Sequence, residues 1–292
     1  MNLNFRDMKT LRLIILLTVT ALCSCEETVT GDITLTTIER LVIEGGIERN
    51  RNNPGAIQSV KLSTTINYLS QDSSPGVTDA TVTVTDGTTT WEFIHTGNGL
   101  YSNSELIPEL NTVYTITIIW RGETYTGNDT LNEVAVFDNF YFEFEEETLF
   151  TDEGYFLKFD STDPAAIENY YYYRVFKNGI YTIVPDPGNS ETLIVSDEFF
   201  DGQQRFGINP NEEVSFTVND IATAQQLGIS QKYFEYLYQV FEQTGNQGVS
   251  FTGNPPPASI RSNVINVTTP SNRPLGFFYA ADIEEQSIQI TE

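Results

Sequence analysis

The sequence predicts a mainly β protein, built from two β-rich parts and one helix. Along most of the chain, hydrophobic residues alternate with polar ones at a period of two, which is typical of half-buried strands. Clusters of Gly, Pro, Asn and Asp interrupt this alternation at short intervals, as turns between strands do. The chain has 292 residues, of which 39% are hydrophobic and 12% aromatic, so it can bury a substantial core.

Residues 1–24 have the pattern of a secretory signal peptide. Lys9 and Arg12 precede a largely apolar run over residues 13–22, which is too short for a membrane span of about 20 residues. The sequence Leu22-Cys23-Ser24-Cys25 resembles a bacterial lipobox, in which Cys25 would carry the lipid and become the mature N-terminus. The alternative is an ordinary signal peptide followed by a chance cysteine. Cleavage before Cys25 also removes Cys23, which leaves the mature chain no free thiol for a disulfide or a metal.

The residues after the cleavage site predict a surface location. Glu26 and Glu27 resemble the acidic export signal that sends Bacteroidota lipoproteins to the outer face of the outer membrane. Residues 25–37 are polar and lack helical periodicity, so we expect a lipidated tether. The predicted location is therefore the outer membrane, with a lipid anchor and the protein facing the cell surface.

Residues 38–132 predict a β-sandwich domain of the immunoglobulin or transthyretin type. About six short alternating segments end near Leu131. Asp86-Gly87 and Arg121-Gly122 each separate two such segments, which predicts β-hairpins. The predicted segments are Leu41–Ile47, Val60–Tyr68, Val82–Val84, Trp91–His95, Val113–Trp120 and Glu123–Thr126.

Residues 133–292 predict a second β-rich domain with one docked helix near residues 231–243. Ser230 is a suitable N-cap, and Gly245 marks the end of the helix. The apolar stripe of this helix consists of Tyr233, Phe234, Leu237, Val240 and Phe241. The predicted strands are Phe137–Glu145, Tyr155–Asp160, Tyr170–Phe176, Tyr181–Val184, Thr192–Val195, Val214–Val218 and Leu275–Ala280.

Charge and composition exclude several classes of function. A net charge of −25 argues against nucleic acid as a partner, because phosphate binding needs a basic surface. His95 is the only histidine, and no nucleophile, phosphate-loop, dinucleotide or zinc-protease motif is present in the sequence. The sequence therefore predicts a non-enzymatic protein. An acid-base glycosidase stays open as the least favoured alternative, because 40 acidic residues always include a pair at a suitable spacing.

Two groups of residues are candidate binding sites. On a strand over residues 170–176, Tyr170, Tyr172 and Phe176 face one way, while Tyr171, Tyr173 and Val175 face the other. At least one face must pack inside, and the first set is the candidate surface for a partner or ligand. No metal cofactor is expected. Asp197, Glu198 and Asp201 form a weak calcium candidate without the spacing of an EF-hand.

The order of several motifs resembles an uncharacterised family of Bacteroidota outer-membrane lipoproteins. The genes of this family often neighbour those of TonB-dependent receptors. The motifs are the lipobox, Arg40–Gly45, Val77–Val84, Tyr114–Ile116, Asp197–Gly202, Tyr233–Leu237, Asn254–Pro257 and Leu275–Phe278. The resemblance covers nearly the whole mature chain, but the inserted Thr268–Asn272 departs from the expected pattern. It implies no catalytic residues and no cofactor apart from the covalent lipid on Cys25.

The resemblance implies an accessory or scaffold subunit of an integral outer-membrane β-barrel complex. The barrel would be a nutrient receptor of the TonB-dependent type or a machine that assembles or exports outer-membrane proteins; other surface lipoproteins are further candidate partners. The alternative is a surface module that captures glycans or peptides, using Tyr170–Tyr173 or aromatic residues near Pro255–Pro257.

Overall fold

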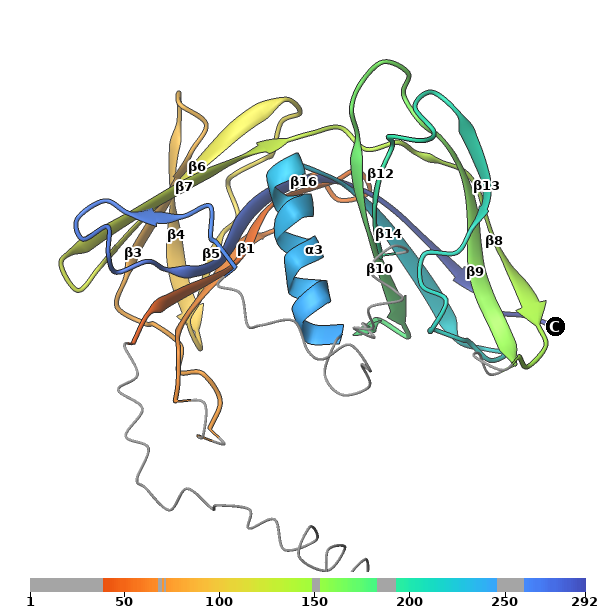
Figure 1. Ribbon diagram of the computed structural model, residues 1–292, viewed down its shortest axis with the longest axis horizontal. Coiled ribbons are helices and arrows are strands. Elements are labelled where there is room, and N and C mark those ends of the chain that lie inside the picture. The colour runs from red at the N-terminus through yellow and green to blue at the C-terminus, as the bar shows by residue number, and fades with distance from the viewer. Residues whose placement is uncertain (1–38, 68–69, 71, 149–152, 183–192, 246–259) are drawn as a thin grey trace, which may run out of the picture. The chain divides into compact units, whose positions relative to one another are not determined.

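The computed structural model describes residues 39–67, 70, 72–148, 153–182, 193–245 and 260–292, and its elements are shown in Figure 1. The described residues form sixteen strands and one helix, which confirms the mainly β fold class. Cys25, Glu26, Glu27 and Pro255–Pro257 lie outside them, so their predicted roles stay predictions.

The first seven strands form a β-sandwich. They are β1 (Leu41–Asn50), β2 (Gln58–Thr64), β3 (Thr81–Thr85), β4 (Thr90–Gly97), β5 (Leu100–Asn103), β6 (Thr112–Trp120) and β7 (Glu123–Leu131). The first half of β4 pairs with β3 and its second half with β5, so the sheet folds over on itself at this strand. Both predicted hairpins are present, and Gly87 and Gly122 adopt the positive φ angles that such tight turns require.

The alternating residues of these strands fill the sandwich core. From one layer come Ile43 and Leu62, and from the other come Val84 and Ile116; all are fully buried. Two residues from the far end of the chain, Phe278 and Ala280, complete this core. The sequence pattern was therefore sufficient to predict the sandwich, but it did not show that a late strand takes part in it.

The remaining elements are nine strands and a helix. They are β8 (Phe137–Glu145), β9 (Gly154–Thr162), β10 (Tyr170–Lys177), β11 (Ile180–Thr182), β12 (Ile194–Ser196), β13 (Gln204–Ile208), β14 (Ile221–Ile229), α3 (Gln231–Gly245), β15 (Ile265–Asn266) and β16 (Leu275–Gln289). The long strand β16 pairs in parallel with β1 and antiparallel with β14. One sheet therefore runs from β11 and β10 through β14, β16 and β1 into the sandwich. The predicted domain boundary at residues 132–133 stays a prediction.

Beyond the sandwich, the strands β10, β14 and β16 are covered on both faces. A separate sheet in the order β13-β9-β8 packs on one face, with Phe159, Tyr171 and Tyr173 in the shared core. The helix α3 packs on the other face, where Tyr233 and Leu237 are buried (Figure 1). This arrangement confirms the predicted docked helix and explains why β10 is aromatic on both sides.

A buried carboxylate joins β1, β16 and the connection that follows β7. Asp282 on β16 is fully buried and accepts hydrogen bonds from Arg49 at 2.7 Å and from Arg51 at 2.9 Å. Its side chain also accepts the backbone N–H of Val134, and Arg51 donates to the Val134 carbonyl. Two guanidinium groups thus hold one carboxylate at the middle of the sheet.

One predicted strand in this half is wrong, and the observed strands β13, β14 and β15 were not predicted. Residues 214–218 form no regular strand, and Phe216 makes a single bridge to Tyr155. Conversely, β14 was not predicted, because its sequence Ile-Ala-Thr-Ala-Gln-Gln-Leu-Gly-Ile carries few large apolar side chains. Small Ala222 and Ala224 are fully buried there, so close packing replaces the usual hydrophobic pattern.

Candidate functional site: a tyrosine-lined cavity

Strand β10 presents Tyr172, Arg174 and Phe176 on the side of α3, because alternate residues of a strand share a face. These side chains line a cavity of about 250 Å³, which we call the tyrosine cavity. Its other walls are Tyr181 of β11, Tyr233 of α3 and Tyr279 of β16. The hairpin of β10 and β11, the helix α3 and the strand β16 therefore converge on one aromatic site.

The aromatic walls are held in fixed positions by their own contacts. The rings of Tyr233 and Tyr279 stack with centroids 4.5 Å apart and planes within 5° of parallel. The hydroxyls of Tyr172 and Tyr181 lie 2.5 Å apart and share a hydrogen bond. Phe176 packs against Tyr181 at 5.3 Å between centroids. The cavity is therefore formed by the fold itself, as is usual for ligand sites.

An ion pair crosses the sheet beside the cavity. Arg174 donates a hydrogen bond to Glu48 Oε1 on β1 at 2.5 Å, and the Tyr279 hydroxyl donates to the same oxygen at 2.6 Å. Burial alone would raise the pKa of Glu48, but attraction to Arg174 and the Tyr279 hydrogen bond outweigh it and keep that pKa below its usual value. Glu48 is therefore ionised and Arg174 is largely neutralised by it.

One polar group in the cavity has no partner. Tyr233 is only 8% exposed, and its hydroxyl makes no hydrogen bond to any residue that the structure describes. Burial raises the pKa of Tyr233, so the group is a neutral phenol. A phenol hydroxyl at a cavity wall is a natural contact point for a ligand.

A second cavity of about 200 Å³ lies on the other side of Tyr279. It is lined by the β1 residues Gly46, Glu48 and Asn50 together with Tyr279 and residues 56–59, and we call it the β1–β2 cavity. Gly46 pairs directly with Tyr279, and a Cβ atom at this position would collide with the Tyr279 backbone and ring. The glycine therefore allows Tyr279 to stand between the two cavities.

The predicted partner surface is only partly assembled at this site. Tyr172 and Phe176 line the tyrosine cavity, whereas Tyr170 packs against Phe234 of α3 and bonds Glu168 instead. Arg174 was missed, although it lies between Tyr172 and Phe176 on the same strand face. Nothing in the sequence near β10 could have indicated Glu48 or Tyr279, because both arrive through strand pairing.

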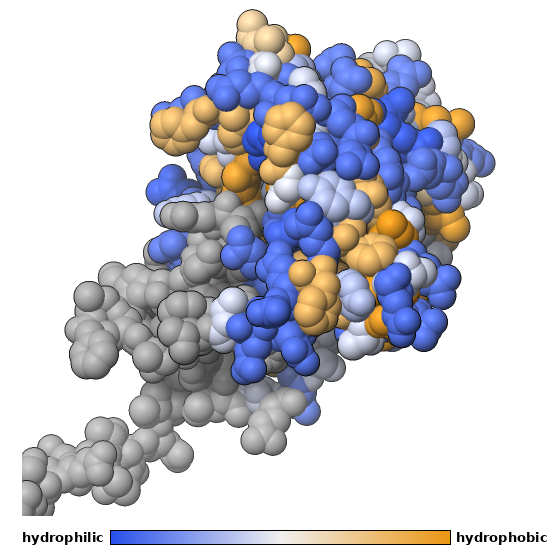
Figure 2. All heavy atoms as spheres, turned by 90° about the vertical axis from the view of Figure 1, so that its right-hand side faces the viewer, coloured by the Kyte–Doolittle hydropathy of each residue, from blue (hydrophilic) through white to orange (hydrophobic). Residues whose placement is uncertain are grey.

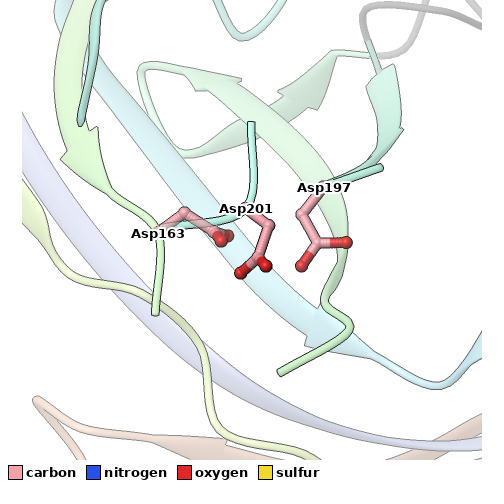
Figure 3. Close-up of side chains that lie close together, drawn as sticks. All are labelled: Asp163, Asp197 and Asp201. Carbon is pink, nitrogen blue, oxygen red and sulfur yellow. The ribbon is translucent and has the colours of Figure 1, made fainter. Parts of the chain in front are cut away.

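The predicted calcium residues lie elsewhere, near the end of β9. Carboxylate oxygens of Asp163, Asp197 and Asp201 lie within 4.8 Å of one another (Figure 3), while Glu198 is exposed and outside this group. Burial, together with the charges of Asp163 and Asp201, raises the pKa of Asp197. Such oxygens are suitable calcium ligands.

Each of the three carboxylates is also occupied by the protein. Asp163 accepts hydrogen bonds from Tyr171 and from the Gly202 backbone, Asp197 accepts from the Asn169 backbone, and Asp201 accepts from the Ala166 backbone. The cluster thereby joins the two loops that follow β9 and β12. The calcium candidate therefore stays a prediction, now with Asp163 in place of Glu198.

The single histidine lies away from these sites. His95 on β4 accepts a hydrogen bond from the Gly99 backbone and packs against Tyr101 at 5.3 Å. It therefore supports a turn of the sandwich, as expected for a polar residue at a strand end.

The sequence matches the family described as a domain of unknown function (DUF4249) over residues 26–287. The chain belongs to this family. No curated protein matches this DUF4249 chain. Within its described residues, no helix has the length and apolar character needed to cross a membrane.

The cavity walls of the DUF4249 protein supply groups that can stack on a ligand and form hydrogen bonds with it. The described walls of the two cavities contribute phenols, a guanidinium, amides and one carboxylate, Glu48. Glycosidases usually need two facing carboxyl groups, and Glu48 is already held by Arg174 and Tyr279. The arrangement can hold a ligand by ring stacking and hydrogen bonds.

Proposed function

We propose that the protein is a non-enzymatic, lipid-anchored accessory subunit of an outer-membrane β-barrel complex, and that it captures a ligand for this partner. In this proposal it is a Bacteroidota surface lipoprotein whose acyl chains are attached at Cys25. The partner is a barrel of the TonB-dependent receptor type, which takes up nutrients. The lipobox and the acidic pair Glu26-Glu27 support the anchor and the surface location.

The observation that carries the capture function is the tyrosine cavity. It is preformed, aromatic and partly polar, and it contains the Tyr233 hydroxyl, which makes no hydrogen bond to the part of the chain that the structure describes. These are the features that distinguish ligand sites from ordinary packing defects, which are apolar and small.

The surface of the molecule supports a reversible partnership with a barrel. Phe199 and Phe206 are 85% and 70% exposed, and Figure 2, which views the side of β8, β9 and β13, shows apolar and polar side chains intermixed. Such mixed composition is typical of non-obligate interfaces. A lipid anchor confines the protein beside its partner, so the effective concentration is high and modest contacts suffice.

Purification of the native, lipidated protein in mild detergent, followed by mass spectrometry, tests the partnership. We expect a stoichiometric outer-membrane barrel to accompany it. A nutrient receptor would support the proposal, whereas a machine that assembles or exports outer-membrane proteins would replace the capture role with a scaffold role. A protein that purifies alone would exclude a stable partnership.

The anchor itself can be tested with two matched cysteine variants. Metabolic labelling with a radioactive fatty acid should mark the wild type and Cys23→Ser equally, because cleavage removes Cys23. Cys25→Ser should lose the label, since its acceptor thiol is gone. Equal labelling of both variants would show that Cys25 is not the lipid attachment site.

A further inference from the structure

We propose that the tyrosine cavity and the β1–β2 cavity are two adjacent subsites for a neutral oligosaccharide, with Tyr279 between them. This inference rests on the capture function proposed above and names the chemical class of its ligand. It is carried by the shared wall, the neutral ion pair and the free hydrogen-bonding groups of the two cavities.

The two cavities share walls. Tyr279 lines both of them, and Glu48 of the β1–β2 cavity bonds directly to Arg174 of the tyrosine cavity. Their volumes, about 250 and 200 Å³, are each below the roughly 300 Å³ at which pockets begin to enclose a drug-sized ligand. A disaccharide would place one sugar ring in each cavity and its glycosidic linkage beside Tyr279, which fits two small cavities with a shared wall.

The charges at the site favour an uncharged ligand. Aromatic walls often attract cations, but the Arg174 guanidinium is already present, 5.7 Å from the centre of the Tyr172 ring. A ligand cation would be repelled by it. An anion would meet the carboxylate of Glu48 within a protein of net charge −25. Because Arg174 and Glu48 neutralise each other, the site as a whole suits an uncharged ligand.

Free hydrogen-bonding groups favour a ligand with many hydroxyls. Arg174 donates one of its five N–H groups to Glu48, and among the described residues its other donors are unused. Glu48 Oε2 and the hydroxyl of Tyr233 also have no partner within this part of the chain. A guanidinium beside a free carboxylate oxygen can donate to one sugar hydroxyl and accept from its neighbour.

The aromatic rings supply the complementary surface. Tyr172, Tyr181, Tyr233 and Tyr279 present large amphipathic rings, whose negative faces suit the C–H faces of a sugar. A peptide would need backbone partners along an extended groove, whereas these two cavities are short and separated by one ring. The observations therefore favour a disaccharide-sized neutral glycan segment over a peptide.

Ligand binding by the full-length protein tests this inference. The protein is kept in a polyoxyethylene detergent, because glucoside and maltoside detergents would compete for the site. Saturation-transfer NMR is recorded with maltose, cellobiose, lactose and mannobiose, and then with a glucuronate disaccharide, a glucosamine disaccharide and neutral tetrapeptides. We expect at least one neutral disaccharide to bind, and the charged ones not to bind.

Two tyrosine variants on the same helix locate the site. Tyr233→Phe removes a hydroxyl that makes no hydrogen bond to the described residues, so folding is retained, and the loss of one ligand hydrogen bond should weaken disaccharide binding about tenfold. Tyr238→Phe is the control, because Tyr238 is 46% exposed and lines neither cavity. Its affinity should equal that of the wild type.

The outcomes separate this inference from the proposed function. Binding of a charged sugar or a tetrapeptide that Tyr233→Phe weakens would overturn the neutral-glycan class while supporting capture. Disaccharide binding that both variants retain would overturn the assignment to this site. If no neutral disaccharide binds while a receptor barrel still co-purifies, the glycan inference fails and the partnership stands.

Discussion

At the scale of single residues, buried carboxylates determine how the protein responds to pH. Asp129 on β7 is 3% exposed and accepts the backbone N–H of Ala280 on β16 at 3.0 Å. Burial outweighs its hydrogen bonds and raises its pKa from 3.8 to about 6. The folded state therefore binds this proton more tightly than the unfolded chain does.

The proton on Asp129 stabilises the folded state at low pH. The stabilisation from protonated Asp129 is complete below about pH 4 and disappears as the pH rises through 6. The free energy of unfolding of Asp129→Asn, relative to that of the wild type, should therefore increase as the pH is raised from 4 to 7.5. The shift corresponds to at most about 3 kcal/mol.

Urea unfolding at pH 4 and at pH 7.5 measures the difference in stability between Asp129→Asn and the wild type. The variant Asp72→Asn, at an exposed carboxylate, controls for the change in net charge. A difference between wild type and Asp129→Asn that does not depend on pH would show that Asp129 does not titrate in this range.

At the scale of elements, the N-terminus of α3 links helix stability to the cavity. The Ser230 hydroxyl accepts the backbone N–H of Tyr233 at 3.1 Å, which confirms the N-cap predicted from the sequence. The same hydroxyl interacts with Asp129, so the cap connects the helix to β7. Because Tyr233 is a cavity wall, a frayed first turn would also disturb the binding site.

We expect Ser230→Ala to reduce the free energy of unfolding by about 1–2 kcal/mol, the usual cost of losing an N-cap side chain. Chemical denaturation measures it, with Ser104→Ala at an exposed loop position as the control. Ser230→Ala should also weaken disaccharide binding, whereas Ser104→Ala should not. Unchanged stability would mean that packing of the apolar face alone fixes the first turn.

The elements also show what the sequence could and could not predict. The hairpins, the helix and most sandwich strands follow from local periodicity and turn residues, which act over a few positions. Strand β14 lacks that signal because its buried residues are small, and the full length of β16 was missed because Ile283 is followed by Glu284, Glu285 and Gln286. Strand β10 was predicted. The positions of Glu48 and Tyr279 beside it depend on strand pairings that no local pattern specifies.

At the scale of the whole molecule, the cluster around Asp282 joins parts of the chain that are far apart in sequence. Arg49 comes from β1, Arg51 from the turn that follows it, Asp282 from β16, and Val134 from the segment after the sandwich. Removal of the carboxylate would leave Arg49 without its ion-pair partner, while Arg51 would keep the Val134 carbonyl and its longer contacts to Glu133 and Glu284. Breaking a buried ion pair in this way is strongly destabilising.

Asp282→Ala should therefore lower the free energy of unfolding by about 3–5 kcal/mol. Thermal and urea unfolding measure the loss, and Asp72→Ala, an exposed acidic position, is the matched control. If Asp282→Ala unfolded no more easily than Asp72→Ala, the cluster would be energetically neutral. In that case the backbone pairing of β1 with β16 alone would hold the region.

The parallel pairing of β1 with β16 also affects the order of events during synthesis. Arg49 and Asp282 are 233 residues apart, so β1 leaves the ribosome long before its neighbour exists. Until β16 emerges, β1 has one open edge and the central sheet cannot close. A chain whose closing strand is made so late can complete its central sheet only after nearly all of its residues have been synthesised.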